Sequence, residues 1–312
     1  MPWTHYRLVF RLESPLHIGW RKVGNLMQTR RYVPGKNLWA ALTEGIVWRA
    51  GQGHDAEAYQ HTGEALKQCF RFGYLWPARS SQDEHGHWAL PTQPHFPWGA
   101  TDLAYWDYLY LDGIARTALD PGHRTSAEGT LHEVEFIAPY TREGAPVHLV
   151  GDLWVRQDLP ACLQTCCAAQ LSDGLKQSIL AWQTALQRLS IGGERGYGWG
   201  RVRLAACDVV PEPTWGTELS WQEVQGDVYL YATALANGPL HLPMHALAVD
   251  FHPDEKAVPH VLGPVEPWLG WERTRAGYRL SKVRILYEPG ARYRADVGAL
   301  WLHPWGMVYT KP

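Results

Sequence analysis

The segment that most constrains this chain is a glycine-rich stretch between a predicted helix and a predicted strand. It covers residues 189–202, reads LSIGGERGYGWGRV, and carries two basic and two aromatic side chains among its glycines. Glycine adopts positive φ readily and lets the backbone approach a ligand, so such a loop can direct several N–H groups at phosphates. Its glycines are Gly192, Gly193, Gly196, Gly198 and Gly200.

The chain is long enough for two domains. Its 312 residues are 46% hydrophobic and 19% charged, and domains usually contain about 100–200 residues. It has no run of about 18 apolar residues that could span a bilayer, and residues 1–5 show no start of a signal peptide. The five cysteines, three of them at Cys162, Cys166 and Cys167, fit reduced thiols better than a disulfide framework. These features predict a cytoplasmic protein.

Basic residues are concentrated in three segments of a chain whose net charge is −2. Residues 1–50 hold eight Lys or Arg against two acids, residues 188–203 hold four against one, and residues 271–294 hold seven against two. The stretches 51–187 and 204–270 are each net −8. The basic segments can converge into one anion-binding surface. Ordinary surface charge is the alternative interpretation.

The first predicted unit is a strand, a basic loop, a turn and a helix. Residues 5–12 alternate as a half-buried strand does. The loop 20–33 contains no Asp or Glu, and Asn37 can cap a helix that runs from Leu38 to about Trp48. One face of the strand carries Tyr6, Leu8, Phe10 and Leu12.

The following segments complete an α+β, ferredoxin-like order of elements. A short helix is predicted near 56–69 and an irregular insertion over 77–99. Ordered segments over 109–120 and 131–137 follow, joined by a hairpin-like link over 121–129. A strand at 147–155 precedes a helix that Ser172 caps and that reaches Leu189. The strand after the glycine loop completes the order β-α-β-β-α-β with insertions.

We place a domain boundary at the Pro211–Pro213 segment, because two prolines in three residues interrupt regular structure. This defines a first domain over 1–210 and a second over 211–312. The second contains strand candidates at 228–235, 247–251, 278–287 and 301–309 and little helical periodicity. It is either a second, degenerate ferredoxin-like domain or a β-rich one.

Four segments carry a resemblance to the RAMP superfamily of CRISPR effector subunits. Residues 14–19 (SPLHIG) and 33–42 (VPGKNLWAAL) look like the superfamily's opening. Residues 115–131 are similar to an internal hairpin motif of several such subunits, and residues 191–202 resemble the superfamily's glycine-rich loop. The resemblance covers about 200 residues and leaves out the last hundred.

The resemblance implies a ferredoxin-like domain of the RNA-recognition type that holds CRISPR RNA (crRNA) in a type III effector ribonucleoprotein. Subunits that cut target RNA place an aspartate in the loop before the Pro-Gly turn, whereas residues 20–33 contain no acid. The chain also continues for 110 residues beyond its glycine loop, which is more similar to the subunit that caps the crRNA 5′ tag. The implied partners are crRNA, the large subunit, backbone subunits and, indirectly, target RNA. A backbone subunit is the alternative within the same complex.

A single-stranded tag can be held by loop amides, by Arg or Lys contacts to phosphates and by aromatic rings that stack on bases. The candidate RNA-binding residues come from the first basic segment and from the glycine loop. They are Arg21, Lys22, Arg30, Arg31, Lys36, Gly192, Gly193, Arg195, Gly196, Tyr197, Gly198, Trp199 and Arg201. No catalytic residue and no cofactor are expected.

Two other functions stay open. A metal-independent endoribonuclease of the same superfamily needs a general base, for which His17 and His54 are the candidates. A protein scaffold without RNA contact would use the glycine loop only as a packing turn. No metal site is expected: the loop histidines lack two further ligands at a defined spacing, Pro243 breaks the helix that would align the paired histidines, and the cysteines fit buried small residues on a helix better than ligands. The clusters considered are His85, His87 and His95; His241 and His245; and Cys162, Cys166 and Cys167.

The position of the glycine loop narrows its interpretation. It lies after the second helix and before the last strand of the predicted domain. Rossmann and P-loop glycine motifs instead follow a first strand. We therefore expect the loop to lie opposite the basic segment 21–36 and to bind single-stranded RNA together with it.

Overall fold

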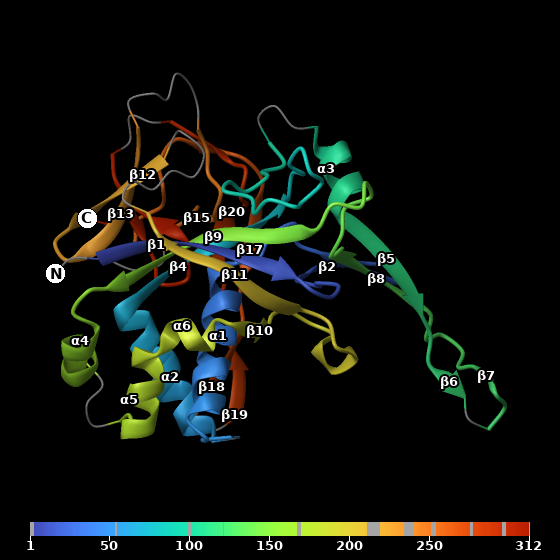
Figure 1. The fold of residues 1–312 in the computed structure, drawn as a ribbon, viewed down its shortest axis with the longest axis horizontal. Coiled ribbons are helices and arrows are strands. Elements are labelled where there is room, and N and C mark those ends of the chain that lie inside the picture. The colour runs from blue at the N-terminus through green and yellow to red at the C-terminus, as the bar shows by residue number, and fades with distance from the viewer. Residues whose placement is uncertain are drawn as a thin grey trace.

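The computed structural model is a mixed α+β fold with several sheets (Figure 1). His54, Cys167 and the predicted boundary at 211–213 lie outside the residues that the structure describes. Those residues are 3–53, 55–98, 102–120, 122–166, 170–210, 219–233, 240–250, 254–274, 277–294 and 298–311.

A five-stranded sheet forms the centre of the first half. All neighbouring strands are antiparallel, and Phe10 pairs with Leu204 on one side and Leu149 on the other. In sheet order the strands are β10 (Arg188–Ser190), β11 (Arg201–Val209), β1 (Trp3–Leu12), β9 (Val147–Arg156) and β4 (Phe70–Arg79).

Both faces of this sheet are covered, because successive side chains of a strand point to opposite faces. Leu8 and Phe10 of β1 pack into the core beneath the helices, as the predicted alternation required. Trp76 and Trp154 point the other way and pack against side chains of the second half. The strands of this sheet carry large apolar residues on both faces and therefore join the two halves of the chain.

Helices cover one face of the sheet (Figure 1). The prediction for 56–69 is confirmed, and Ser172 caps α5 as expected. These helices are α1 (Gly35–Arg49), α2 (Ala56–Cys69), α4 (Leu159–Cys166), α5 (Asp173–Leu180) and α6 (Trp182–Ala185), while α3 (Leu103–Tyr110) lies elsewhere.

Two predicted helices have different limits. The first begins at Gly35 and not at Leu38, with Pro34 as its N-cap residue. The helix predicted from Ser172 to Leu189 is interrupted at Ala181, and Leu189 lies in β10. Pairing of β10 with β11 satisfies its backbone groups in the sheet, so this tertiary contact outweighs the helical period.

The predicted basic loop 20–33 is a hairpin of β2 (Gly19–Val23) and β3 (Leu26–Thr29). Strand β3 pairs in parallel with β8 (His132–Ile137), which pairs with β5 (Leu111–Arg116). In Figure 1 β5 and β8 extend away from the body toward β6 (Leu119–Asp120) and β7 (Thr125–Ser126). The second partner of β3, strand β8, is distant in the sequence, so a local pattern does not reveal this pairing.

The second half is built from strands, and the described residues after 218 contain no helix. A seven-stranded sheet is its largest part. Its strands in sheet order are β12 (Leu219–Val224), β13 (Asp227–Ala232), β22 (Leu300–Leu302), β23 (Val308–Tyr309), β15 (Ala246–Leu247), β20 (Arg284–Tyr287) and β17 (Val265–Trp268). Smaller sheets contain β14 (Leu240–His241), β21 (Arg292–Tyr293) and β16 (Val261–Leu262), and the hairpin β18 (Trp271–Thr274) with β19 (Gly277–Leu280).

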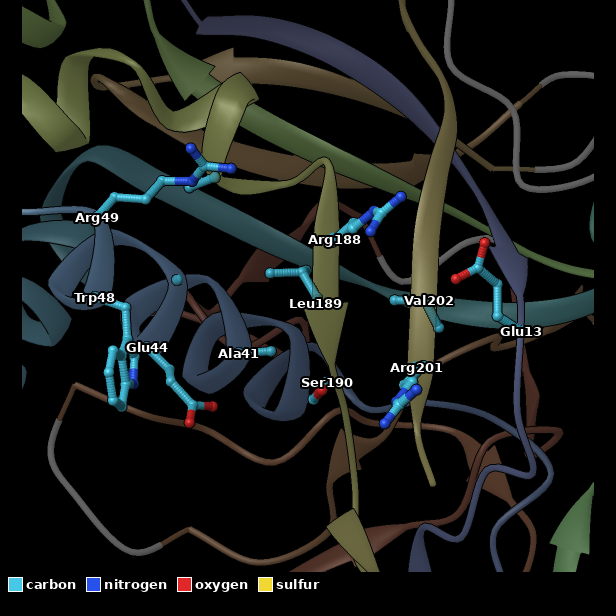
Figure 2. A pocket seen from close by; sticks show the side chains of 12 residues that line it. Glu13, Ala41, Glu44, Trp48, Arg49, Arg188, Leu189, Ser190, Arg201 and Val202 are labelled. Atoms are coloured by element: carbon cyan, nitrogen blue, oxygen red, sulfur yellow. The ribbon is translucent and has the colours of Figure 1, made fainter. Parts of the chain in front are cut away.

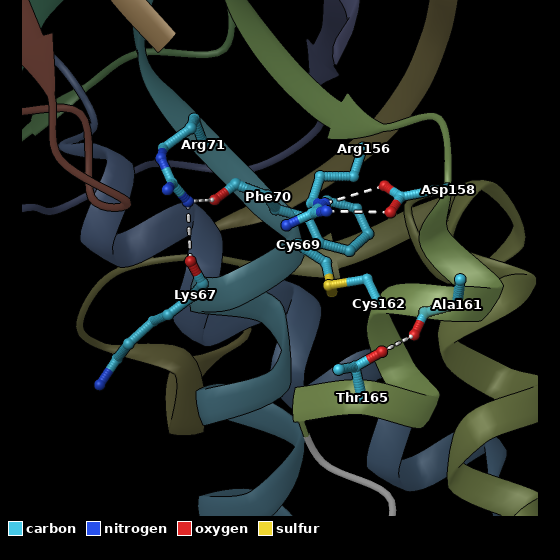
Figure 3. The surroundings of a disulfide bond; sticks show 9 residues. All are labelled: Lys67, Cys69, Phe70, Arg71, Arg156, Asp158, Ala161, Cys162 and Thr165. Atoms are coloured by element: carbon cyan, nitrogen blue, oxygen red, sulfur yellow. Dashed lines mark hydrogen bonds and ion pairs between the residues drawn. A yellow bond between two sulfur atoms is a disulfide. The ribbon is translucent and has the colours of Figure 1, made fainter. Parts of the chain in front are cut away.

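A disulfide joins Cys69 at the end of α2 to Cys162 in α4 (Figure 3). The expectation that the cysteines are reduced thiols is therefore wrong for this pair. The two residues are separated by 93 positions, and the packing of α2 against α4 brings them together. Cys207 is a free thiol among the described residues.

We expect Cys69→Ser to lower the free energy of unfolding by about 2–4 kcal/mol, because the bridge restricts a long loop in the unfolded chain. Urea unfolding with and without a reductant measures this effect. Reductant should destabilise the wild type and leave Cys69→Ser unchanged. Cys207→Ser is the matched control and should change the value by less than about 1 kcal/mol. Equal stability of the oxidised and reduced wild type would contradict the prediction.

Candidate nucleic-acid interface

The glycine loop is attached to the body by its own amides. Gly193 N–H donates to the carbonyl of His17, and Gly200 N–H donates to the carbonyl of Pro15, each at 2.8 Å. Gly198 N–H donates to the carbonyl of Arg195 at 2.9 Å. The first two N–H groups attach the loop to the body, and the third closes a turn within the loop. None of the three is directed at a ligand, unlike the arrangement expected from the sequence.

Two glycines of the loop allow close backbone contact. Gly192 has φ of +85°, and a Cβ there would lie 2.4 Å from the His17 carbonyl oxygen. Gly200 has φ of +74°, and a Cβ there would lie 1.9 Å from the Ile191 carbonyl oxygen. Gly196 has nothing within 4 Å of such a Cβ. The loop therefore needs glycine at its two ends for steric reasons.

The two aromatic residues of the loop have different environments. Trp199 is buried, with its ring 4.9 Å from Phe136 of β8, whereas Tyr197 is 75% exposed. The Arg116 guanidinium lies 4.6 Å from the Tyr197 ring and 4.5 Å from the Trp199 ring, and it pairs with Glu194 at 2.7 Å. Trp199 thus packs the loop against β5 and β8, and Tyr197 is the aromatic ring open to a base. Sequence reasoning did not identify Arg116, because nothing local connects 116 with 194–199.

The cations of the β2–β3 hairpin and its continuation pair with distant acids. Arg21 binds Glu288 at 2.8 Å, and Arg31 binds both carboxylate oxygens of Asp107, at 2.6 and 2.7 Å. Lys22 is exposed on β2. Two predicted phosphate contacts thus already have carboxylate partners.

Arg30 belongs to a buried network between the two halves. It donates to Glu266 at 2.6 and 3.0 Å and to the Tyr32 hydroxyl at 3.0 Å. His245 donates to the same carboxylate, and the Tyr74 hydroxyl donates to His245 Nδ1. Arg30 therefore holds the hairpin on the second half.

The charges in this network follow from burial and pairing. Burial lowers the pKa of His245 to about 4, so its ring is neutral at neutral pH. Burial alone would raise the pKa of Glu266, but hydrogen bonds from His245 and Arg30 lower it to about 2. At neutral pH the network thus contains one ion pair, Arg30 with Glu266, and a neutral imidazole.

The hairpin, the glycine loop and the start of α1 border one hollow of about 460 Å³, here called the hairpin hollow. Trp20 and Lys36 line it beside Gly192 and Gly193, and residues 267–269 of the second half complete it. Arg195 and Arg201 lie outside this hollow: Arg195 pairs with Glu44 of α1, and Arg201 is exposed at the start of β11. Of the predicted RNA-binding residues, the structure thus brings Arg30, Lys36, Gly192 and Gly193 together around this hollow and leaves Arg195 and Arg201 outside it.

No group of three or more His, Cys, Asp or Glu suited to a metal ion is present among the described residues. No helix in this described part of the chain is long and apolar enough to cross a membrane.

The fold and the site define an α+β protein in which a glycine loop, a basic hairpin and a helix start border a common hollow. No protein-family model and no curated protein matches the sequence. Chains in cryo-EM structures of the Type III-B Cmr-beta complex are similar to it. One, from the complex bound to cognate target RNA and AMPPnP in state 1, is 14% identical with a TM-score of 0.44, over 92% of this chain and 85% of that chain. Another, from the complex bound to cognate target RNA, is 11% identical with a TM-score of 0.39, over 65% and 98%.

Proposed function

We propose that this chain is a non-catalytic, crRNA-binding subunit of a type III CRISPR effector ribonucleoprotein in the cytoplasm. It would hold the crRNA 5′ tag in the hairpin hollow and dock on the large subunit. The observation that carries the proposal is the convergence of Gly192 and Gly193 with Trp20 and Lys36 around one hollow. Three sequence segments that carry or adjoin the RAMP resemblance thereby become neighbours.

The order of the central strands supports a ferredoxin-like first domain. Counted along the chain, the long strands β1, β4, β9 and β11 are first to fourth, and the sheet order is fourth, first, third, second. Helices follow the first and the third of these strands. We propose this arrangement for residues 1–210, followed by a β-rich domain over 211–312.

A tag-holding role fits the chemistry of the hollow. Lys36 supplies a positive charge, and Trp20 supplies an indole ring whose N–H donates to Glu266 at 3.1 Å. Single-stranded RNA is bound by such combinations of cations and aromatic rings. The alternative role is that of a crRNA-binding backbone subunit of the same complex, since this chemistry suits any single-stranded stretch of crRNA.

An endoribonuclease is a second candidate function because of His17. Its Nδ1 donates to the carbonyl of Glu135 at 2.7 Å, which leaves Nε2 as an acceptor beside the glycine loop. A histidine with this tautomer can act as a general base. The cleavage test below separates this candidate from the non-catalytic proposal.

Binding of a 5′-tag RNA of about 8 nucleotides to the full chain tests the proposal. We expect the affinity to fall with salt at a log–log slope of roughly −2 to −4, as about 3–6 phosphate contacts require. Lys22→Ala/Lys36→Ala should reduce the magnitude of this slope by about 0.7 per lost contact. Fluorescence anisotropy at several salt concentrations measures both quantities.

The control variant Lys256→Ala/Arg292→Ala removes two exposed charges that line none of the hollows described for this chain and should bind like the wild type. A salt-independent affinity would overturn the proposal. Incubation with repeat RNA and a chelator should leave the RNA intact. Specific cleavage that His17→Ala abolishes would instead establish the endoribonuclease.

A further inference from the structure

The hairpin hollow is one end of a longer groove along α1. A second hollow of about 460 Å³ shares Asn37, Ala40 and Gly192 with it. A third hollow, here called the arginine pocket, measures about 620 Å³ and shares Ala41, Glu44 and Ser190 with the second. The three hollows therefore follow one another from the start of α1 to its end.

Close packing of α1 against α6 and β10 forms this groove. A Cβ at Gly45 of α1 would lie 3.3 Å from the carbonyl of Ala185 and 3.5 Å from the Leu189 side chain. Leu189 pairs with Val202, and both point into the core. Side chains alternate along a strand. Arg188 and Ser190, on either side of Leu189, therefore point to solvent, as do Arg201 and Arg203 on either side of Val202.

Three arginines border the arginine pocket without a carboxylate partner among the described residues. Figure 2 shows Arg49 on α1, Arg188 on β10 and Arg201 on β11 around this pocket. All three are exposed. The two acids of the pocket have partners of their own: Glu13 binds Arg203 at 2.8 Å, and Glu44 binds Arg195. Uncompensated positive charge is therefore greater here than at the hairpin, where the acids pair with Arg21, Arg30 and Arg31.

An aromatic ring accompanies these cations. Trp48 lines the same pocket and is 53% exposed. An exposed ring beside unpaired guanidinium groups is the combination that binds a base and its neighbouring phosphates.

We infer that the arginine pocket binds phosphodiesters of single-stranded RNA and that the bound strand continues into it from the hairpin hollow along α1. This inference rests on the proposed function, since it extends the same RNA. Arg49, Arg188 and Arg201 contact phosphates, and Trp48 stacks on a base.

The test compares two RNAs on the full chain: the tag alone, about 8 nucleotides, and the tag extended to about 16 nucleotides. Arg49→Ala/Arg188→Ala should bind the tag like the wild type and bind the extended RNA about tenfold more weakly. The magnitude of its log–log salt slope for the extended RNA should fall by about 1.4, which corresponds to the loss of two phosphate contacts. Trp48→Ala should weaken only the extended RNA, by about tenfold.

Lys256→Ala/Arg292→Ala removes the same charge elsewhere and should bind both RNAs normally. Wild-type affinity of the arginine and Trp48 variants for the extended RNA would overturn the inference and leave the proposed function intact. Equal losses for both RNAs would also overturn it, because the pocket would then be part of the tag site. Salt-independent binding of both RNAs to the wild type would overturn the proposed function, and this extension with it.

Discussion

Glu266→Gln is expected to lower the free energy of unfolding by about 3–5 kcal/mol, because it leaves the buried Arg30 charge without its carboxylate. Arg30 and Glu266 are 12% and 8% exposed, so water replaces little of the lost interaction. Glu266 also accepts from His245 and from Trp20 Nε1, so the substitution disturbs three donors at once. Urea unfolding at neutral pH measures the effect.

Glu143→Gln is the matched control, since Glu143 forms an ion pair with Arg79 in which both side chains are nearly half exposed. Solvent screening limits such a pair to about 0–1 kcal/mol. The double variant Arg30→Met/Glu266→Gln should recover part of the loss, because it removes the unpaired charge as well. Wild-type stability of Glu266→Gln would show that this network does not hold the two halves together.

Gly200→Ala is expected to destabilise the protein by roughly 3–4 kcal/mol. An alanine at positive φ costs about 1–2 kcal/mol, and Gly200 has φ of +74°. The new Cβ would also displace the Ile191 carbonyl, which disturbs the hydrogen bonds of Gly200 to Pro15 and of Ile191 to Gly200, worth about 1 kcal/mol each. Thermal and urea unfolding of the variant test this.

Gly196→Ala is the control in the same loop, because a Cβ there meets nothing within 4 Å. It should change the free energy of unfolding by no more than about 0.5 kcal/mol. Equal destabilisation by both substitutions would mean that the loop needs glycine for flexibility and not for the close backbone contact at Gly200.

The ion pairs change which cations are available to an RNA. Arg30 and Arg31 are predicted phosphate contacts, yet their guanidinium groups bind Glu266 and Asp107. Arg49 and Arg188 were not selected from the sequence, yet they border the arginine pocket with no carboxylate partner in the described part of the chain. The positive surface of the molecule thus lies further along α1 than the predicted RNA-binding residues 21–36 suggest.

Short-range patterns of the sequence correctly predict several elements. The alternation in residues 5–12 identifies Leu8 and Phe10 as core residues, since a strand with one buried face leaves this period. Ser172 is identified as a helix cap because its hydroxyl accepts from a backbone N–H three residues on. The strand β11 that follows the glycine loop is also predicted correctly, whereas β10 separates the loop from the preceding helix.

The same patterns fail where a distant segment decides the outcome. The hairpin within 20–33 becomes part of a four-stranded sheet because β3 also pairs with β8, more than one hundred positions away. Leu189 joins a strand because β11 supplies its hydrogen-bond partners. Cys69 and Cys162 form a disulfide because α2 packs on α4. In each case a long-range contact supplies more free energy than the local preference.

By itself, the sequence of this protein determined several of the local elements, the buried face of the first strand and the presence of basic and glycine-rich segments. Those properties depend on residues only a few positions apart, so the periodic pattern of apolar and polar residues that reveals them can be read from the sequence. Only the tertiary structure decided which charges are neutralised and which remain open, as for Arg30 at Glu266 and Arg188 at the arginine pocket. The reason is that an ion pair depends on the distance between two side chains in space, and folding sets that distance through contacts across the whole chain.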